Sequence, residues 1–476
     1  MKRFGMMSAL FAAAALAACS PDLATGPAAA PRAPAHEGAT APGQYLVTFK
    51  GQIPADFAQR VAALGGTVLY QHAGIGFAAV AGLTDDAAVR LGTSTGVADV
   101  SVDAEFQADI GQSVETELND VAESQTSPAT AARYPFQWNM RFIHASAAWS
   151  AGKLGSSSVT AAIIDTGLDY TIPDLNGLVD LSRSVSFVPS DNALNAAFFP
   201  TRHPVDDYNG HGTNVATQVS SKAFALAGVT SRTTLIGVKV LGRTGSGSTS
   251  GVLAGLAWAA DHGANVANMS LGGSFLKAGN GQFVALFNKA LNYAKQKGML
   301  VVVSAGNSAA DLDHDGNQFV TYCSATHVIC VSSVGPVLSA GSGDIPSYYT
   351  NYGRSAIGVA APGGNAGSTL SAWPWGNDSV SWVWSYCPKF RIAGLTTAGV
   401  PVLTACQAGN RLSGFIGTSQ ASPHVTGLAA LLMAEYGTDA VQTRHRILTS
   451  ALDMGETGTD PFFGRGRIDV AAALGL

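Results

Sequence analysis

Gly417-Thr-Ser-Gln-Ala-Ser-Pro-His-Val425 is the stretch of this chain that says most about its fold. It leads into apolar residues at helical spacing that stop at Gly437, a common C-terminal cap. Because the N–H that proline lacks has no partner in a first helical turn, we expect Pro423 to mark the helix origin. Ser419 is then predicted at a helix start, where unpaired N–H groups favour negative charge beside its hydroxyl. A capping serine ahead of a core helix would fit this stretch equally well if it stood alone.

Two upstream segments supply the groups that a serine nucleophile needs. Residues 158–164 form a nearly unbroken apolar run, typical of a buried parallel strand, and Asp165 follows at the carboxyl end, where open α/β sheets build their sites. His211 lies between two glycines at a second expected helix start. A serine hydroxyl needs a base to take its proton, and an imidazole base needs an acid to hold its tautomer. We therefore predict Asp165, His211 and Ser419 as a catalytic triad.

These motifs, in the order Asp, His, Ser, resemble those of the subtilisin-like serine proteases, the subtilase family or peptidase S8. The resemblance runs from about residue 136, with Trp138-Asn-Met-Arg-Phe-Ile143, to Gly464-Arg-Gly-Arg-Ile-Asp-Val470. It implies a catalytic domain over residues 135–476, with an open, mostly parallel α/β sheet covered by helices on both faces. It also implies a serine endopeptidase that works through an acyl-enzyme intermediate, acts on protein or peptide substrates and needs no cofactor for its chemistry.

The chain departs from the family pattern at two positions outside the triad. Asn214 stands where a second His is frequent, and Gln420 where Met is common. These departures bear on rate and specificity rather than on the chemistry.

The resemblance also assigns the oxyanion hole and part of the substrate cleft. Ser304-Ala-Gly-Asn307 follows the apolar residues 299–303 and resembles the oxyanion motif, in which Asn307 donates its amide together with the Ser419 N–H. A plain turn after a strand is the alternative. Ser270, Leu271 and Gly272, with Ser304, Ala305 and Gly306, are the expected substrate-binding residues, where an extended peptide adds as a strand. The small-residue loop 245–250 is either the opposite wall of the cleft or a flexible loop.

The N-terminus predicts export. Met1-Lys-Arg3 precedes an apolar, Ala-rich stretch, residues 4–18, that is too short to span a membrane, so residues 1–18 are expected to be a signal peptide. Leu16-Ala-Ala-Cys19 resembles the bacterial lipobox, which implies a lipid on Cys19; ordinary secretion with a chance cysteine is the alternative. Residues 19–43 are rich in Pro, Ala and Gly and are expected to form a tether. The expected location is the bacterial cell envelope, as a periplasmic or outer-membrane lipoprotein, or the medium after release.

Residues 44–106 are predicted to form a small α+β domain. Strands are expected at 45–49, 67–70, 76–80 and 97–102, and helices at 56–64 and 85–91. This order resembles the ferredoxin-like inhibitory prodomain of subtilases, of the inhibitor I9 type; a permanent accessory domain is the alternative. Residues 107–134 are polar and lack periodicity, so we expect an exposed linker that holds the processing site of a self-processing zymogen precursor.

Cysteines and charge agree with an exported enzyme. The chain has 476 residues and five cysteines, of which four remain if Cys19 carries lipid. Local disulfides, Cys323 with Cys330 and Cys387 with Cys406, are the simplest of three pairings. A net charge of −5 offers no basic stripe, so nucleic acid is not an expected partner. The Trp-rich insertion 364–413 is either a cover over the cleft or a surface excursion held by a disulfide.

The acidic residues Asp311, Asp313 and Asp315 resemble the first half of an EF-hand loop. The twelfth position of such a loop is Tyr322 rather than Glu, so an EF-hand is not expected. Two interpretations remain, a structural calcium site of another type and a solvated acidic loop. The resemblance to subtilases, many of which carry calcium, raises the expectation of a calcium site but does not fix its ligands.

Overall fold

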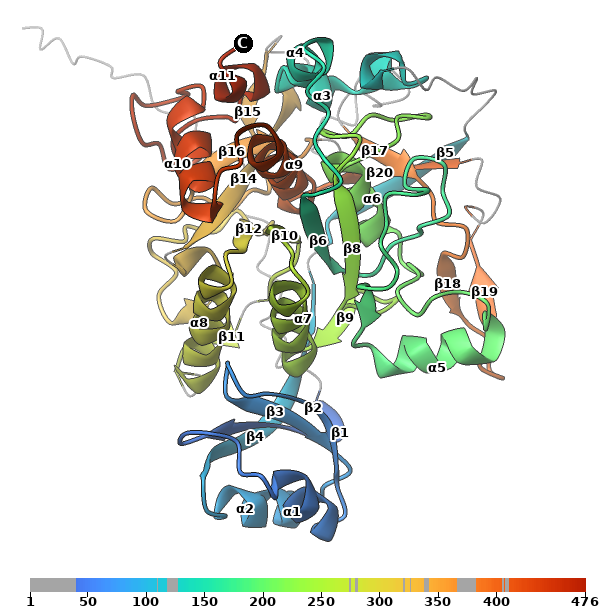
Figure 1. Ribbon diagram of the computed structural model, residues 1–476, viewed down its shortest axis with the longest axis vertical. Coiled ribbons are helices and arrows are strands. Elements are labelled where there is room, and N and C mark those ends of the chain that lie inside the picture. The colour runs from blue at the N-terminus through green and yellow to red at the C-terminus, as the bar shows by residue number, and fades with distance from the viewer. Residues whose placement is uncertain are drawn as a thin grey trace, which may run out of the picture.

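An eight-stranded sheet organises the C-terminal part of the chain (Figure 1). The computed structural model describes residues 40–108, 110–117, 127–273, 275–278, 281–319, 322–325, 327–337, 342–365, 382–404, 406 and 411–476. The strand order is β15-β14-β12-β10-β6-β8-β7, with β16 also on β14, and every pairing is parallel except β14 with β15. The strands are β6 (Thr160–Asp165), β7 (Val185–Ser186), β8 (Thr234–Lys239), β10 (Val266–Met269), β12 (Leu300–Ser304), β14 (Val328–Val337), β15 (Ser342–Pro346) and β16 (Val359–Pro362).

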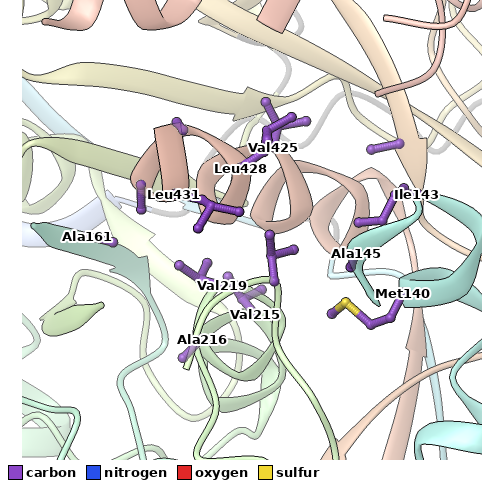
Figure 2. Packing of buried hydrophobic residues seen from close by; sticks show 14 of the residues in the cluster. Met140, Ile143, Ala145, Ala161, Val215, Ala216, Val219, Val425, Leu428 and Leu431 are labelled. Carbon is purple, nitrogen blue, oxygen red and sulfur yellow. The ribbon is translucent and has the colours of Figure 1, made fainter. Parts of the chain in front are cut away.

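Helices cover both faces of this sheet, as predicted. Alternate residues of β6 face opposite sides, so Ala161 and Ile163 pack with α6 (His211–Val219) and α9 (Thr418–Tyr436), as Figure 2 shows in part. Ala162 and Ile164 pack with α7 (Thr249–Asp261) and α8 (Gly281–Gln296) on the other face. Peripheral elements are α3 (Trp138–Phe142), α4 (Ala145–Ser150), α5 (Pro189–Phe198), α10 (Ala440–Ser450), α11 (Val470–Leu474), β11 (Phe275–Leu276), β13 (Gln318–Phe319) and η3 (Tyr322–Ser324).

The N-terminal unit has the predicted β-α-β-β-α-β order. Its elements are β1 (Thr40–Phe49), α1 (Phe57–Ala63), β2 (Thr67–His72), β3 (Phe77–Ala81), α2 (Asp85–Gly92) and β4 (Val97–Gln107). The strands lie in the order β2-β3-β1-β4, which is the ferredoxin-like arrangement. One face of the sheet carries α1 and α2, and the other faces α7 and α8 of the larger domain (Figure 1).

The helix that carries Ser419 differs from the prediction at its start. We expected Pro423 in the first turn, but α9 begins at Thr418 and Pro423 lies inside it. A proline inside a helix leaves the carbonyl four residues earlier without its usual donor. That carbonyl belongs to Ser419, and the Ser270 hydroxyl donates to it at 2.6 Å. The helix therefore continues through the proline because a side chain of another segment replaces the missing bond.

The linker and the insertion both hold regular structure. Residues 107–134 contain β5 (Gln112–Glu117) and η1 (Pro128–Thr130), and η2 (Tyr134–Phe136) begins at their end, so the described part is more ordered than an exposed link. The insertion contains β17 (Val383–Tyr386), β18 (Ile392–Leu395) and β19 (Pro401–Leu403), and β20 (Arg411–Ile416) starts within it. Both predicted disulfides, Cys323–Cys330 and Cys387–Cys406, are present. In the described part of the chain, no helix is long and apolar enough to cross a membrane.

Candidate active site

Asp165 and His211 form a buried pair at the carboxyl edge of the sheet. Asp165 is the last residue of β6, and His211 is the first residue of α6. The His211 Nδ1 lies 2.7 Å from Asp165 Oδ1, and both side chains are fully buried. A neutral imidazole that donates from Nδ1 to the carboxylate carries its lone pair on Nε2. The pair thus presents a base on the side away from Asp165.

A second carboxylate holds the loop that carries His211. Asp207 accepts the N–H groups of Gly210 and Thr213, both at 2.9 Å, and the Thr166 hydroxyl at 3.0 Å. Gly212 must be glycine, because a Cβ there would lie 2.2 Å from the Gly167 carbonyl oxygen. The motif around His211 indicated the base, whereas the bracing role of Asp207 had no signal of its own in the sequence.

Ser419 is the second residue of α9 and is 1% exposed. Its hydroxyl donates to the main-chain oxygen of Ser270 at 3.2 Å, and among the described residues His211 Nε2 has no hydrogen-bond partner. Helices α6 and α9 pack together, and Asn214 and Gln420, beside the two catalytic positions, are joined at 3.3 Å. The Ser419 hydroxyl is thus bonded to Ser270 rather than to His211, and catalytic hydrogen bonds commonly tighten only when substrate is bound.

Asn307 is oriented by the residue that precedes Ser419. Its Oδ1 accepts the Thr418 N–H at 2.8 Å and the Thr418 hydroxyl at 2.9 Å. These two bonds fix the Asn307 oxygen on Thr418, so the amide nitrogen is the other end of the side chain. Thr418 also accepts the Gly306 N–H at 2.9 Å, so one threonine ties the Asn307 loop to the start of α9.

Asn351 braces the same loop and was missed by the sequence analysis. Its side chain donates to the Ala305 oxygen at 2.8 Å and accepts from the N–H groups of Ser308 and Ala310. Gly306 has φ +98, and a Cβ there would lie 2.4 Å from Asn351. No motif marks Asn351, because its role comes from a contact between segments distant along the chain.

The predicted substrate residues divide into supporting and lining positions. The Ser270 hydroxyl donates to the Ser419 oxygen at 2.6 Å and lies 2.8 Å from the Ser422 hydroxyl. The Ser270 side chain therefore supports α9, and only the main chain of Ser270 could bind a peptide. Leu271, Ser304 and Ala305 are buried, whereas Gly272 and Gly306 are half-buried. Across from them, residues 246–248 form a short strand, β9 (Ser246–Ser248), that pairs with β4. The segment is therefore an ordered strand rather than a flexible loop, and its role as the opposite wall of the cleft stays a prediction.

A buried histidine supports α9 from behind. His424 Nδ1 lies 2.8 Å from the Gln420 oxygen, and its Nε2 lies 2.8 Å from the Asn139 amide nitrogen. Burial lowers the pKa of His424 to about 4, which keeps the ring neutral at physiological pH. The imidazole acts as a spacer between helices and takes no part in the chemistry.

The acidic loop does not assemble a metal site. Asp311 pairs with His314 at 2.8 Å, Asp313 accepts the Ser355 hydroxyl at 2.6 Å, and Asp315 pairs with Lys277 at 2.9 Å. Each carboxylate has its own partner, and no group of three or more potential ligands converges in the part of the chain described. The three residues do not fit a calcium site together, and structural calcium is left without assigned ligands. Cys19 and the tether lie outside the described residues.

Known proteins share this architecture. Residues 156–466 match the model of the subtilase family. Thermitase from Thermoactinomyces vulgaris is 30% identical over 341 residues, which cover 71% of this chain and 95% of thermitase. A thermophilic serine proteinase from Bacillus sp. strain AK1 is 31% identical over 337 residues, 70% of this chain but 66% of that protein.

A solved structure extends the likeness across most of the chain. The epidermin leader peptide processing serine protease from Staphylococcus aureus superposes with a TM-score of 0.70 at 23% identity, covering 91% of this chain and 98% of that one. At this identity the likeness concerns the fold alone. Family match, relatives and fold agree with the site geometry, and the chain therefore belongs to the subtilase family as a subtilisin-like serine endopeptidase.

Proposed function

We propose that Asp165, His211 and Ser419 hydrolyse peptide bonds through an acyl-enzyme. The buried 2.7 Å contact between Asp165 and His211 carries this proposal, because it leaves Nε2 as the base. The Ser419 hydroxyl attacks the scissile carbonyl while Nε2 takes its proton, and Asp165 stabilises the imidazolium. His211 then passes the proton to the leaving amine, and water releases the acyl group by the reverse sequence.

The oxyanion that forms during attack is expected to meet two donors, the Asn307 amide and the Ser419 N–H. Replacing Asn307 with Ala should lower kcat by about 10²–10³ with little change in KM, because this donor acts on charge that exists only in the transition state. Peptide hydrolysis by the purified variant measures the effect. The exposed Asn176→Ala change serves as a control and should leave kcat unchanged. A loss of less than tenfold in the Asn307 variant would contradict the assigned role.

We propose further that residues 44–106 are an inhibitory prodomain. Leu46, Ile75 and Phe77 belong to the same buried cluster as α7 and α8 of the catalytic domain. His72 pairs with Asp261 at 3.0 Å across this interface. The Asp103 carboxylate accepts from the N–H and hydroxyl of Ser250 in the first turn of α7, although burial raises its pKa. The apolar contacts and the hydrogen bonds from Ser250 to Asp103 together support a specific complex between the two units.

The chain leaving the prodomain runs along the proposed cleft. Gln107 pairs with Ser246 of β9, and the Ala108 N–H donates to the Gly245 oxygen at 3.0 Å. Four residues later Gln112 pairs with Ile416, three positions before Ser419. Ala108 thus lies at one side of the proposed cleft and Gln112 at the other, beside the start of α9, where a protease binds the peptide that it cuts.

Self-processing should therefore cut between residues 108 and 112, within the linker predicted from sequence. Proximity makes the first cut effectively unimolecular, so its rate should not depend on precursor concentration. N-terminal sequencing of the purified active enzyme locates the cut, and a Ser419→Ala precursor should keep its prodomain. An active enzyme that begins near Cys19 with the small domain still attached would refute the prodomain assignment.

We also propose that the precursor is exported and carries lipid on Cys19. The ground is the Leu16-Ala-Ala-Cys19 sequence and the tether that follows it. A Cys19→Ser variant should lose detergent-phase partitioning, because no acyl chain can be attached to it. Both forms are compared by phase separation of whole-cell extracts. Equal partitioning of variant and parent would exclude the anchor and leave ordinary secretion.

A further inference from the structure

The strand that enters the nucleophile helix carries a second strand along its edge. β20 leads through Gly417 and Thr418 into Ser419, and β5 pairs with it antiparallel over six residues, from Gln112 with Ile416 to Glu117 with Arg411. The sheet order is β17-β20-β5, so β5 is an edge strand held on one side. β5 lies downstream of segment 108–112 and thus occupies the leaving-group side of the proposed cleft.

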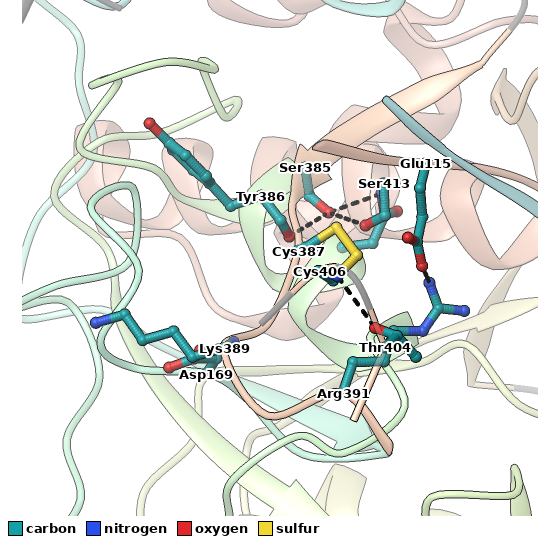
Figure 3. The surroundings of a disulfide bond; sticks show 11 residues. Glu115, Asp169, Ser385, Tyr386, Cys387, Lys389, Arg391, Thr404, Cys406 and Ser413 are labelled. Carbon is teal, nitrogen blue, oxygen red and sulfur yellow. Dashed lines mark hydrogen bonds and ion pairs between the residues drawn. A yellow bond between two sulfur atoms is a disulfide. The ribbon is translucent and has the colours of Figure 1, made fainter. Parts of the chain in front are cut away.

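A salt bridge joins this strand to the insertion. Arg391 Nη1 donates to Glu115 Oε1 at 2.8 Å, and the two side chains are 19% and 25% exposed (Figure 3). A charge-assisted hydrogen bond shielded to this degree is stronger than an open surface pair. The β5–β20 pairing is made by main-chain groups and does not depend on side-chain identity. The contact with Arg391 adds an interaction that depends on the side chain at position 115.

Arg391 is held in place by the catalytic domain. It lies on the loop closed by the Cys387–Cys406 disulfide, and its main-chain oxygen accepts the Thr404 N–H at 2.9 Å (Figure 3). Its guanidinium lies 5.9 Å from the ring centroid of Phe415, and the Phe415 ring also contacts the His211 ring at 5.8 Å. The main chain of Arg391 is thus held by the catalytic domain, and its guanidinium lies near the Phe415 ring as well as Glu115.

We propose that Arg391 is a specificity-determining residue that selects substrates with a carboxylate on the leaving-group side of the scissile bond. This inference rests on the proposed function. Cleavage upstream frees the N-terminal end of β5, and its departure opens the edge of β20. An extended peptide then takes the same edge, and an acidic side chain in the place of Glu115 meets Arg391. In this proposal the insertion borders the cleft through Arg391, which is closer to the expected cover than to a surface excursion.

Peptides with the chain's own residues 103–118, flanked by a fluorophore and a quencher, test this proposal on the processed enzyme. The parent peptide should have a kcat/KM about tenfold above a Glu115→Gln peptide and more above a Glu115→Lys peptide, mainly through KM. The preference should shrink at 1 M salt, where exposed charges are screened. A Glu105→Gln peptide, changed upstream of the cut, is the matched control and should retain the parent value.

Enzyme variants assign the preference to one residue. Arg391→Gln should hydrolyse the parent and Glu115→Gln peptides equally, while Arg391→Glu should favour the Glu115→Lys peptide. Lys389→Gln is the matched control, because Lys389 is on the same loop with its side chain pointing away from Arg391 (Figure 3). Equal cleavage of all peptides by the unaltered enzyme, or an unchanged preference in Arg391→Gln, would overturn the inference alone. Failure to cleave any peptide would instead count against the proposed function.

Discussion

Replacing Ser419 with Ala is expected to lower peptide hydrolysis by about 10⁶-fold, the magnitude measured in subtilisin, a member of the same family. In the proposed mechanism the hydroxyl oxygen is the attacking atom, and alanine has no atom that can form the acyl-enzyme. Folding should be nearly unaffected, because the side chain makes one hydrogen bond, to the Ser270 oxygen, worth about 1 kcal/mol. Initial rates on a quenched peptide, together with circular dichroism, measure both properties.

Ser422 offers a matched control for this substitution. It lies on the same helix, is fully buried, and places its hydroxyl 2.8 Å from the Ser270 hydroxyl. Ser422→Ala makes the same chemical change without removing the nucleophile, so activity should stay within about tenfold of the parent. Appreciable turnover by a well-folded Ser419→Ala enzyme would end the assignment of the nucleophile, even if the Ser422 variant behaved as expected.

The second large effect is expected from Asp165→Asn, which should reduce kcat by about 10⁴-fold. Asp165 accepts from His211 Nδ1 and from the Thr166 N–H, both at 2.7 Å. An amide in its place is neutral, so it cannot stabilise an imidazolium and it permits the tautomer that carries its proton on Nε2. A ring protonated at Nε2 cannot accept the proton of Ser419.

A control substitution at a different carboxylate accompanies that measurement. Asp180→Asn makes the same change at a half-buried carboxylate whose side-chain partners are Ser182 and Arg183, and should leave kcat unaltered. If Asp165→Asn kept more than a tenth of the parent kcat at neutral pH, the carboxylate would not be the partner of the base.

Much of the candidate site could be predicted because its residues belong to short motifs that can be recognised in the sequence. An apolar strand that ends in Asp165, a histidine between glycines and a serine before a helix each have a meaning within a few residues of sequence. The disulfides could be predicted for the same reason, since each pair closes a short loop. The position of Pro423 was misjudged because the contact that permits it comes from Ser270, which follows β10 and is distant along the chain.

The sequence by itself therefore determined the fold class, the order of the domains and the identity of the proposed triad. Strand periodicity and helix capping act within one segment, so they can be recognised before the chain is folded. Only the tertiary structure decided which groups hold the residues of the candidate site. Thr418 donates to the Asn307 side chain, and Asn351 donates to the Ala305 oxygen in the Asn307 loop. It also decided that Glu115, from an apparent linker, meets Arg391, from an insertion 276 residues away along the chain. Such contacts depend on register and packing between distant segments, which no local pattern encodes.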